Sequence, residues 1–533
     1  MFSNSRVTRR QVLQLIGASA GGAAVMNTMT AWGHMPVAAQ TTPPKLDGNG
    51  NGTKVIVLGA GPGGCPAAWE LVKLGYDVTV IEARDRLGGH AFTVRGGSRH
   101  TEYGKGEEVC TWDEGLWYDA GPSRIPFYHQ GFFHYAKEFN IPLIDHKNLN
   151  LNAWVYMEDV AGPLNAKRMR LHEMQADMAG YTSELLAKAI NKDQLDSPLT
   201  AEEDDMLIDY LVNWGMISAK DLTYRGTDTR GYDVLPDTQS PGKIGTPPSL
   251  SDWLPVASAA LQWQGGYLSA AATFDWQTTL VKPKEGIGQL YEEGFKQALG
   301  ERVHLNCKVN EIRQSDDGVR IVYEDTTSGE VQEITGDYCL CNIPLSVLLR
   351  IPSDFSSDMK AAIQGVPYDM AIRMGVGYKR RFWEEDDQIY GGQSFTNLPE
   401  LSILGYPDND YHAQKGVLLN AYAWGTDAAH LSTFSYQERI DRILDIGVKI
   451  HPQMKDEYES GFSVAWHLEP YSLGAWPNYN ERSRTQFFPR LQEPDGRVYL
   501  VGEHLSYVNA WIEGAVQSAW LQVEKLHSRV MQG

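Results

Sequence analysis

The sequence predicts an α/β protein whose parallel sheet is assembled from distant segments of the chain, with an α+β domain and a helical insertion between them. Three observations predict this fold class. Residues 54–84 show the pattern strand, glycine turn, helix, strand, and residues 496–520 show strand, loop, helix. Between residues 146 and 270, the segments 174–190 and 201–214 have the apolar periodicity of amphipathic helices.

Length and charge narrow the classes of function. The chain has 533 residues, which predicts two or three domains and leaves room for a large buried cofactor. Its 67 acidic and 47 basic residues give a net charge of −20, which disfavours nucleic acid and anionic membrane surfaces as partners. The five cysteines have spacings unlike a disulfide framework or a zinc site, and the histidines are scattered, so we expect no metal. Cys339 and Cys341 fall on one face of a strand, where buried apolar residues are expected.

The N-terminus resembles a twin-arginine export signal. Arg9 and Arg10 precede a weakly apolar, small-residue run, and residues 37–39 (Val-Ala-Ala) form a small-residue cleavage site. We therefore predict a signal peptide over residues 1–39 and an exported protein, periplasmic or secreted; an amphipathic structural helix is the alternative. No later segment reaches roughly 18 uninterrupted apolar residues, so no membrane contact is expected after cleavage.

The glycine turn after residue 58 predicts a Rossmann-type dinucleotide site. Gly59, Gly61 and Gly64 complete G-x-G-x-x-G, which permits a tight turn and lets the backbone approach a pyrophosphate at a helix N-terminus. Glu82 ends the next strand, 18 residues after Gly64, and is placed to accept hydrogen bonds from ribose hydroxyls.

Two further features favour a flavin over a nicotinamide. Gly88 and Gly89 form a second glycine turn just after the acidic residue, where another segment would approach a dinucleotide closely. At the other end of the chain, a helix predicted to start near Trp511 offers free backbone amides to an electron-rich ring edge.

With these motifs, the sequence resembles the flavin-containing amine oxidase superfamily, and within it the L-amino acid oxidases, from Lys54 to the C-terminus. The resemblance implies that FAD is the cofactor, that the enzyme is a homodimer, that Val309 contacts adenine and that Glu503 contacts the ribityl chain. It implies FAD-binding segments at 40–105, 276–350 and 496–533, substrate-domain segments at 106–145 and 351–495, and a helical insertion at 146–275. The cofactor residues carried over are Gly59, Gly61, Pro62, Gly63, Gly64, Glu82, Ala83, Gly89, His90, Gly121, Pro122, Ser123, Arg124, Val309, Gly502, Glu503, Trp511, Ile512 and Ala515.

The sequence departs from the family pattern at two positions. The family commonly has arginine after the second glycine pair, where this chain has His90, so cofactor affinity or flavin electrostatics would differ. Ala475 stands where monoamine oxidases carry the cysteine that links FAD covalently, and we therefore expect non-covalent FAD.

The resemblance also implies the residues that face the substrate. Lys379, four residues before Trp383, matches the lysine that holds a water against the flavin of monoamine oxidases, with Arg381 as the fallback and a solvated basic face as the alternative. Trp476 and Trp511 match the two aromatic residues that enclose the substrate amine, although either could be core.

A carboxylate grip separates amino acid oxidases from simple amine oxidases. Arg124, in the turn GPSRIP, matches the arginine that binds the substrate carboxylate, and a guanidinium fork suits a carboxylate. Tyr422 matches the second carboxylate contact, and Ala510 lies in the turn that meets the substrate and the isoalloxazine.

These observations together predict FAD-dependent oxidation of an L-amino acid by oxygen, to a 2-oxo acid, ammonia and hydrogen peroxide. The tryptophan-rich walls favour a large apolar or aromatic side chain. Three alternatives stay open: an amine oxidase acting on a substrate without a carboxylate, an amino acid 2-monooxygenase, and an exported flavin-binding protein without turnover. We also expect residues 223–250, rich in Gly, Pro, Thr and Asp, to be a long surface loop.

Overall fold

The computed structural model describes residues 41–195, 199–268, 274–276 and 279–532. The chain divides into two compact units, Met1–Lys45 and Leu46–Gly533, and the second holds all the helices and strands given below. The predicted signal peptide, 1–39, lies outside the described residues. Within the described part of the chain, no helix combines the length and the apolar character needed to cross a bilayer.

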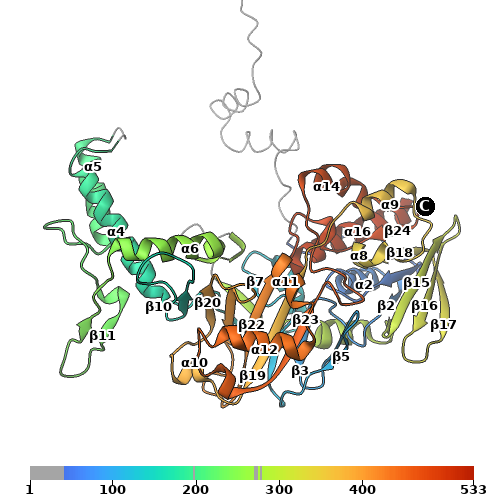
Figure 1. Ribbon diagram of the computed structural model, residues 1–533. Helices are drawn as coiled ribbons and strands as arrows, with labels where there is room; N and C mark the ends of the chain where they lie inside the picture. Colours follow the sequence, from blue (N-terminus) through green and yellow to red (C-terminus); the bar gives the residue numbers. More distant parts are fainter. Residues whose placement is uncertain (1–40, 196–198, 269–273, 277–278, 533) are drawn as a thin grey trace, which may run out of the picture. The chain divides into compact units, whose positions relative to one another are not determined.

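A five-stranded parallel sheet is assembled from three separated segments, as the sequence predicts (Figure 1). Its strands are β1 (Lys54–Leu58), β2 (Asp77–Ile81), β14 (Val303–His304), β18 (Tyr338–Cys341) and β24 (Val498–Leu500). The order β14-β2-β1-β18-β24 places the glycine-turn strand β1 at the centre, with every neighbouring pair parallel. The carboxyl ends of strands from all three segments therefore meet at one edge of the sheet, where α/β proteins bind their ligands.

Both faces of this sheet are buried, which explains its near-continuous apolar strands. Val55 and Val57 of β1 enter one hydrophobic core, together with apolar residues of the covering helices. Ile56 and Leu58 enter a second core on the opposite face. The helices are α2 (Gly64–Lys73) and α16 (Ile512–Gln532) on the first face, and α8 (Leu345–Leu348) and α9 (Ser357–Gln364) on the second.

A seven-stranded sheet forms the centre of the predicted substrate domain. Its order is β10-β9-β20-β21-β22-β19-β23. The strands are β9 (Trp154–Tyr156), β10 (Arg168–Arg170), β19 (Ala371–Tyr378), β20 (Gly392–Thr396), β21 (Ile403–Tyr406), β22 (Gly416–Trp424) and β23 (Tyr458–Ala465). Because β9 pairs with β20 and β10 pairs with β9, the first part of the predicted 146–275 insertion belongs to this sheet.

The rest of the insertion contains the helices that the apolar periodicity predicts. They are α4 (Leu171–Ile190), α5 (Ala201–Trp214) and α6 (Leu250–Leu268), grouped in green in Figure 1. A capping box between Thr200 and Glu203 starts α5. The expected surface loop at 223–250 contains a short hairpin, β11 (Tyr232–Val234) with β12 (Lys243–Ile244), so it is more ordered than its composition suggests.

A small antiparallel sheet carries the GPSRIP turn. Strand β13 (Leu280–Pro283) pairs with β7 (Ile125–Pro126) and β8 (Leu143–His146), so the start of the predicted 276–350 FAD segment joins the neighbourhood of Arg124 rather than the parallel sheet. All five cysteines are buried and free. The burial of Cys339 and Cys341 agrees with their expected apolar role.

The remaining elements connect these layers. The strands are β3 (Thr93–Arg95), β4 (Arg99–Glu102), β5 (Gly106–Val109), β6 (Trp117–Asp119), β15 (Cys307–Gln314), β16 (Val319–Asp325) and β17 (Val331–Gly336). The helices and helical turns are α3 (Gln130–Glu138), η1 (Asp228–Arg230), η2 (Phe274–Trp276), η3 (Leu290–Phe295), α7 (Lys296–Leu299), η4 (Gly300–Arg302), α10 (Phe382–Glu385), α11 (Gly425–Leu431), α12 (Tyr436–Gly447), α13 (Met454–Glu457), α14 (Glu481–Gln486), α15 (Phe488–Leu491) and η5 (Glu503–Leu505).

Candidate functional site

The turn between β1 and α2 requires glycine. Gly59 has φ +90°, in the left-handed region that favours glycine. A Cβ added to Gly64 would lie 1.9 Å from the carbonyl oxygen of Gly59, so a side chain there would break the turn. Helix α2 starts at Gly64, directly after this turn, so its N-terminus lies at the carboxyl end of β1.

Glu82, at the carboxyl end of β2, is buried and held by the backbone. Its Oε2 accepts a hydrogen bond from the amide of Ala60 at 2.7 Å, and its Oε1 accepts one from the amide of Arg84 at 2.9 Å. A carboxylate has about four acceptor positions, so Glu82 retains acceptor capacity for a ribose. The Arg84 guanidinium is itself fixed by Glu469 at 2.6 Å.

A cavity of about 620 Å³ runs from this edge to the predicted substrate domain. It is lined by most of the residues that the sequence singles out as cofactor or substrate contacts. These are Gly59, Gly61, Pro62, Glu82, Ala83, Gly89, His90, Gly121, Pro122, Val309, Tyr422, Trp476, Gly502, Glu503, Ala510, Trp511, Ile512 and Ala515. Five predicted residues do not line it: Gly63, Gly64, Ser123, Arg124 and Lys379.

The start of α16 lines the cavity with Ile512 and Ala515. The Glu503 carboxylate accepts a hydrogen bond from the amide of Ala510, which holds the turn before the helix. Burial nevertheless raises the pKa of Glu503 to about 8, because the backbone contacts only partly offset the loss of water. Ala510 itself has φ +66°, a strained conformation for a residue with a side chain.

His90 is a buried imidazole on the cavity wall. Its Nε2 has no hydrogen-bond partner, and its ring lies edge-on to Trp466 at a centroid distance of 4.3 Å. Burial, followed by the charges of Arg84 and Arg86, lowers the pKa of His90 to about 3, so the ring is neutral at physiological pH. Trp466 donates to the carbonyl of Ala120 at 2.8 Å and lines the cavity, although the sequence patterns did not single it out.

The GPSRIP turn contributes backbone to the cavity and positions Arg124 beside it. A Cβ on Gly121 would lie 1.8 Å from the carbonyl oxygen of His90, so the close approach requires glycine. The half-buried Arg124 donates to Oδ1 of Asn148 at 3.3 Å. Its guanidinium carbon lies 5.9 Å from the ring centroid of Trp511, which lines the cavity, and 5.7 Å from that of Trp276.

The assignment of Lys379 to the catalytic site is corrected. Lys379 follows the last residue of β19, is exposed, and donates from Nζ to the carbonyl of Asp456 at 2.9 Å. The alternative, Arg381, is buried, and its guanidinium donates hydrogen bonds to the Glu384 carboxylate and to two backbone carbonyls. Arg381 does not line the cavity either. A strand rises about 3.3 Å per residue, so the far end of an eight-residue strand lies on the order of 20 Å from the end that borders the cavity.

Arg373, six residues earlier on β19, is the basic residue of this strand that lines the cavity. It donates to the carbonyl of Gly121 and to Oγ of Ser123, the latter at 3.3 Å. Its guanidinium carbon lies 4.5 Å from the centroid of the Tyr422 ring. The sequence held a usable signal for it, because an arginine inside the apolar strand AIRMGVGY is unusual and called for a partner.

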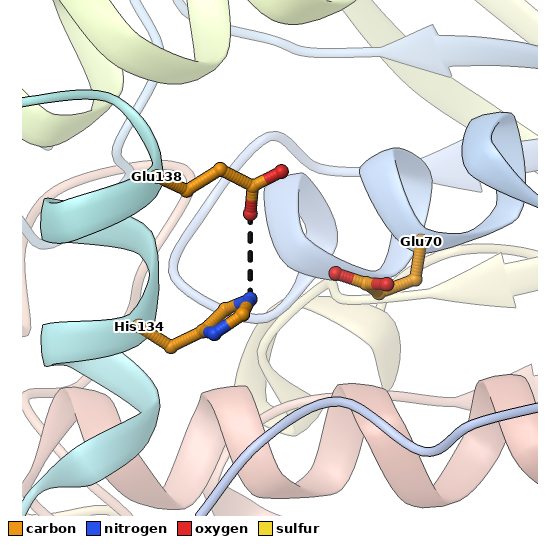
Figure 2. Close-up of side chains that lie close together, drawn as sticks. All are labelled: Glu70, His134 and Glu138. Atoms are coloured by element: carbon orange, nitrogen blue, oxygen red, sulfur yellow. Dashed lines mark ion pairs between the residues drawn. The ribbon is translucent and has the colours of Figure 1, made fainter.

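Among the described residues, one side-chain cluster has the composition of a metal site. Figure 2 shows His134 and Glu138 of α3 facing Glu70 of α2. The ammonium of Lys73 lies 2.8 Å from Glu70 and 3.5 Å from Glu138, so a cation already neutralises these carboxylates. This cluster is a local ion-pair network between two helices.

The sequence matches the family described as flavin containing amine oxidoreductase over residues 64–233 and 245–527. The chain belongs to this family. The eleven-residue gap in the match, 234–244, falls within the β11–β12 hairpin region.

Relatives and solved structures agree with the family. An L-amino acid oxidase from Bothriechis schlegelii is 26% identical over 487 residues, covering 89% of this chain and 90% of that protein. An L-amino-acid oxidase from Pseudechis australis is 26% identical over 481 residues, covering 89% and 86%. Cyclohexylamine oxidase from Brevibacterium oxydans and a putrescine oxidase bound to putrescine share the fold, with TM-scores of 0.58 and 0.56 at 18% identity, each covering 90% of this chain and 99% of the other.

The flavin of this family fits the cavity. Glycines at positions 61 and 121 leave room where a Cβ would collide with neighbouring atoms. The unpartnered Nε2 of His90 and the remaining acceptor capacity of Glu82 give the wall hydrogen-bonding groups that a bound molecule can use. The N-terminus of α16, whose first residue Ile512 lines the cavity, adds a partial positive charge there.

Proposed function

We propose that this protein binds FAD without a covalent link and oxidises an L-amino acid with oxygen, giving a 2-oxo acid, ammonia and hydrogen peroxide. The observation that carries the proposal is the GPSRIP turn. It contributes Gly121 and Pro122 to the cavity wall and sets the Arg124 guanidinium near Trp511, which also lines the cavity. A fixed cation beside a reaction cavity is suited to an α-carboxylate, which a simple amine lacks.

The proposed roles follow from where each side chain lies. Arg124 and Tyr422 hold the carboxylate, while Trp476 and Trp511 line the cavity on either side of the amine and exclude water. When bound, FAD supplies the acceptor for the hydride from Cα and passes the electrons to oxygen. Hydrolysis of the imino acid then releases ammonia. The aromatic walls favour a substrate with a large apolar or aromatic side chain.

The cysteines support a non-covalent cofactor. Ala475, which lines the cavity near Trp476, has no thiol. Cys307 also lines the cavity, and its amide donates to the carbonyl of Glu82 at 2.8 Å, so it lies beside the residue proposed to bind the ribose.

The products test this proposal. The FAD-loaded protein is incubated with each of the twenty amino acids, and peroxide, ammonia and the 2-oxo acid are measured. The proposal predicts all three in equal amounts. Amide and carbon dioxide instead would identify a monooxygenase, oxidation of decarboxylated amines alone would identify an amine oxidase, and no turnover at all would leave a flavin-binding protein.

Two further predictions of the sequence are kept as proposals. Export by the twin-arginine route is compatible with five free, buried cysteines, because the fold needs no disulfide and can be completed before export.

A homodimer is supported by an apolar stripe on one face of α5, where Met206, Tyr210 and Trp214 are each more than half exposed (57%, 57% and 60%).

A further inference from the structure

The Arg373 guanidinium is a buried cation without a carboxylate partner. Among the described residues, no aspartate or glutamate oxygen lies within ion-pair distance of it, and its exposed fraction is 5%. It donates hydrogen bonds to the carbonyl of Gly121 and the hydroxyl of Ser123, both neutral, and its Nε has no hydrogen-bond partner. A buried charge in this condition is costly to keep unless something else neutralises it.

The surroundings of Arg373 increase this cost. Burial lowers its pKa and the charge of Arg124 lowers it further, while Tyr422, Tyr118 and the buried carboxyl of Asp119 only partly offset this. The influence of Arg124 shows that the two guanidinium groups share one neighbourhood. An anion bound between them would remove the repulsion and supply the missing partner for Nε.

The contacts of Arg373 favour the substrate carboxylate over the cofactor phosphates as the anion that it would bind. Its side chain is bonded to Gly121 and Ser123, the two residues that flank Pro122 in the turn that carries Arg124. Its guanidinium carbon lies over the Tyr422 ring, 4.5 Å from the centroid. These contacts attach it to the residues proposed to hold the substrate carboxylate, whereas the predicted contacts to the cofactor phosphates, Gly59 to Gly64, come from β1 and α2.

We propose that Arg373 is a second anion-binding residue of the substrate cavity and that it holds the substrate carboxylate together with Arg124. This inference rests on the proposed function, since it assigns a further specificity-determining residue to the same site. Arg124, beside the cavity, and Arg373, on its wall, then both favour a substrate with a carboxylate over an amine that lacks one.

The test measures binding without turnover. Benzoate and the neutral benzamide are titrated into the FAD-loaded protein, and the change in the visible flavin spectrum gives a Kd for each. The variants are Arg373→Gln, which removes the charge, and Arg373→Lys, which keeps it. Arg350→Gln is the control, because Arg350 lines the same cavity, is exposed, and is joined to the GPSRIP turn by no hydrogen bond among the described residues.

We expect Arg373→Gln to weaken benzoate by about 10- to 100-fold, the effect of losing hydrogen bonds to a charged group, and to leave benzamide unchanged. Arg373→Lys should recover much of the loss and Arg350→Gln should show none. Unchanged benzoate binding in Arg373→Gln, or an equal loss of benzoate and benzamide, overturns the inference. If Arg373→Gln binds no FAD, the comparison is made on Arg373→Lys, where equal Kd changes for both probes overturn it.

Two outcomes separate this inference from the proposed function. Benzoate binding that depends on Arg373 in a protein that oxidises no amino acid supports the anion site and contradicts the proposed function. A changed flavin midpoint potential in Arg373→Gln, with benzoate binding unchanged, assigns the guanidinium to the cofactor and overturns the inference.

Discussion

Replacing Arg124 by alanine removes the proposed carboxylate grip while leaving the cavity wall in place. The wall at this point is the backbone of Gly121 and Pro122, so FAD content should change little. In the folded protein, the hydrogen bond to the neutral Asn148 at 3.3 Å contributes on the order of 1 kcal/mol, and the ring contacts with Trp511 and Trp276 are lost with it. The variant should therefore fold and load FAD.

The effect on catalysis is larger. A guanidinium fork makes two charge-assisted hydrogen bonds worth roughly 1.5–3 kcal/mol each, so their loss should lower kcat/KM for an amino acid by about two to four orders of magnitude. The assay compares the amino acid with its decarboxylated amine in both proteins, with peroxide as the readout. Wild type should strongly prefer the amino acid, and Arg124→Ala should lose most of that preference. A variant that keeps the preference would show that Arg124 is structural.

Three further predictions concern cofactor, stability and assembly. Acid precipitation should release all the flavin as FAD, because Ala475 offers no thiol; yellow pellet protein after washing would contradict this. Burial raises the pKa of Glu108 to about 8 from 4.5, so its carboxyl costs stability as the pH rises above about 4.5, and the full cost is reached above pH 8. Glu108→Gln should accordingly raise Tm by a few degrees at pH 9 and change it little at pH 4, and an equal shift at both pH values would refute the assignment. Trp214→Glu places a charge in the exposed apolar stripe of α5 and should convert a dimer to a monomer in sedimentation experiments. Leu349→Glu is the control, because Leu349 is also exposed but lies outside this stripe. A dimer unaffected by Trp214→Glu would place the interface elsewhere.

The parallel sheet and the glycine turn could be predicted because their constraints are local. Gly59 and Gly64 must be glycine for reasons set within a few residues, and the apolar strands around them report burial on both faces. The helices of the insertion were predictable for the same reason, since their apolar periodicity is complete within each segment. The pairing of β13 with β7 and β8 was not, because it joins residues more than a hundred positions apart.

The parts of the cavity wall that the backbone forms could be predicted from the sequence. The parts that depend on the position of a single side chain could not. The spacing of four residues before Trp383 predicted Lys379 as the site residue. The position of a residue along β19 decides whether it borders the cavity, and the residue that does so is Arg373, not Lys379. The unpartnered Nε of Arg373 and Nε2 of His90 depend on what surrounds them in three dimensions, which no local pattern records. The apolar character of β19 was the one available indication that its arginine has a special role.

The central claim is that the cavity oxidises an α-amino acid and recognises it by its carboxylate. The most direct measurement is anaerobic reduction of the protein-bound flavin, followed at its visible absorption band, with one L-amino acid, its D-enantiomer, and the matching amine that lacks the carboxylate. The account predicts rapid bleaching by the L-amino acid, and at least about a hundredfold slower bleaching by the amine, from the loss of two charge-assisted hydrogen bonds. Bleaching by the amine as fast as by the amino acid would contradict it.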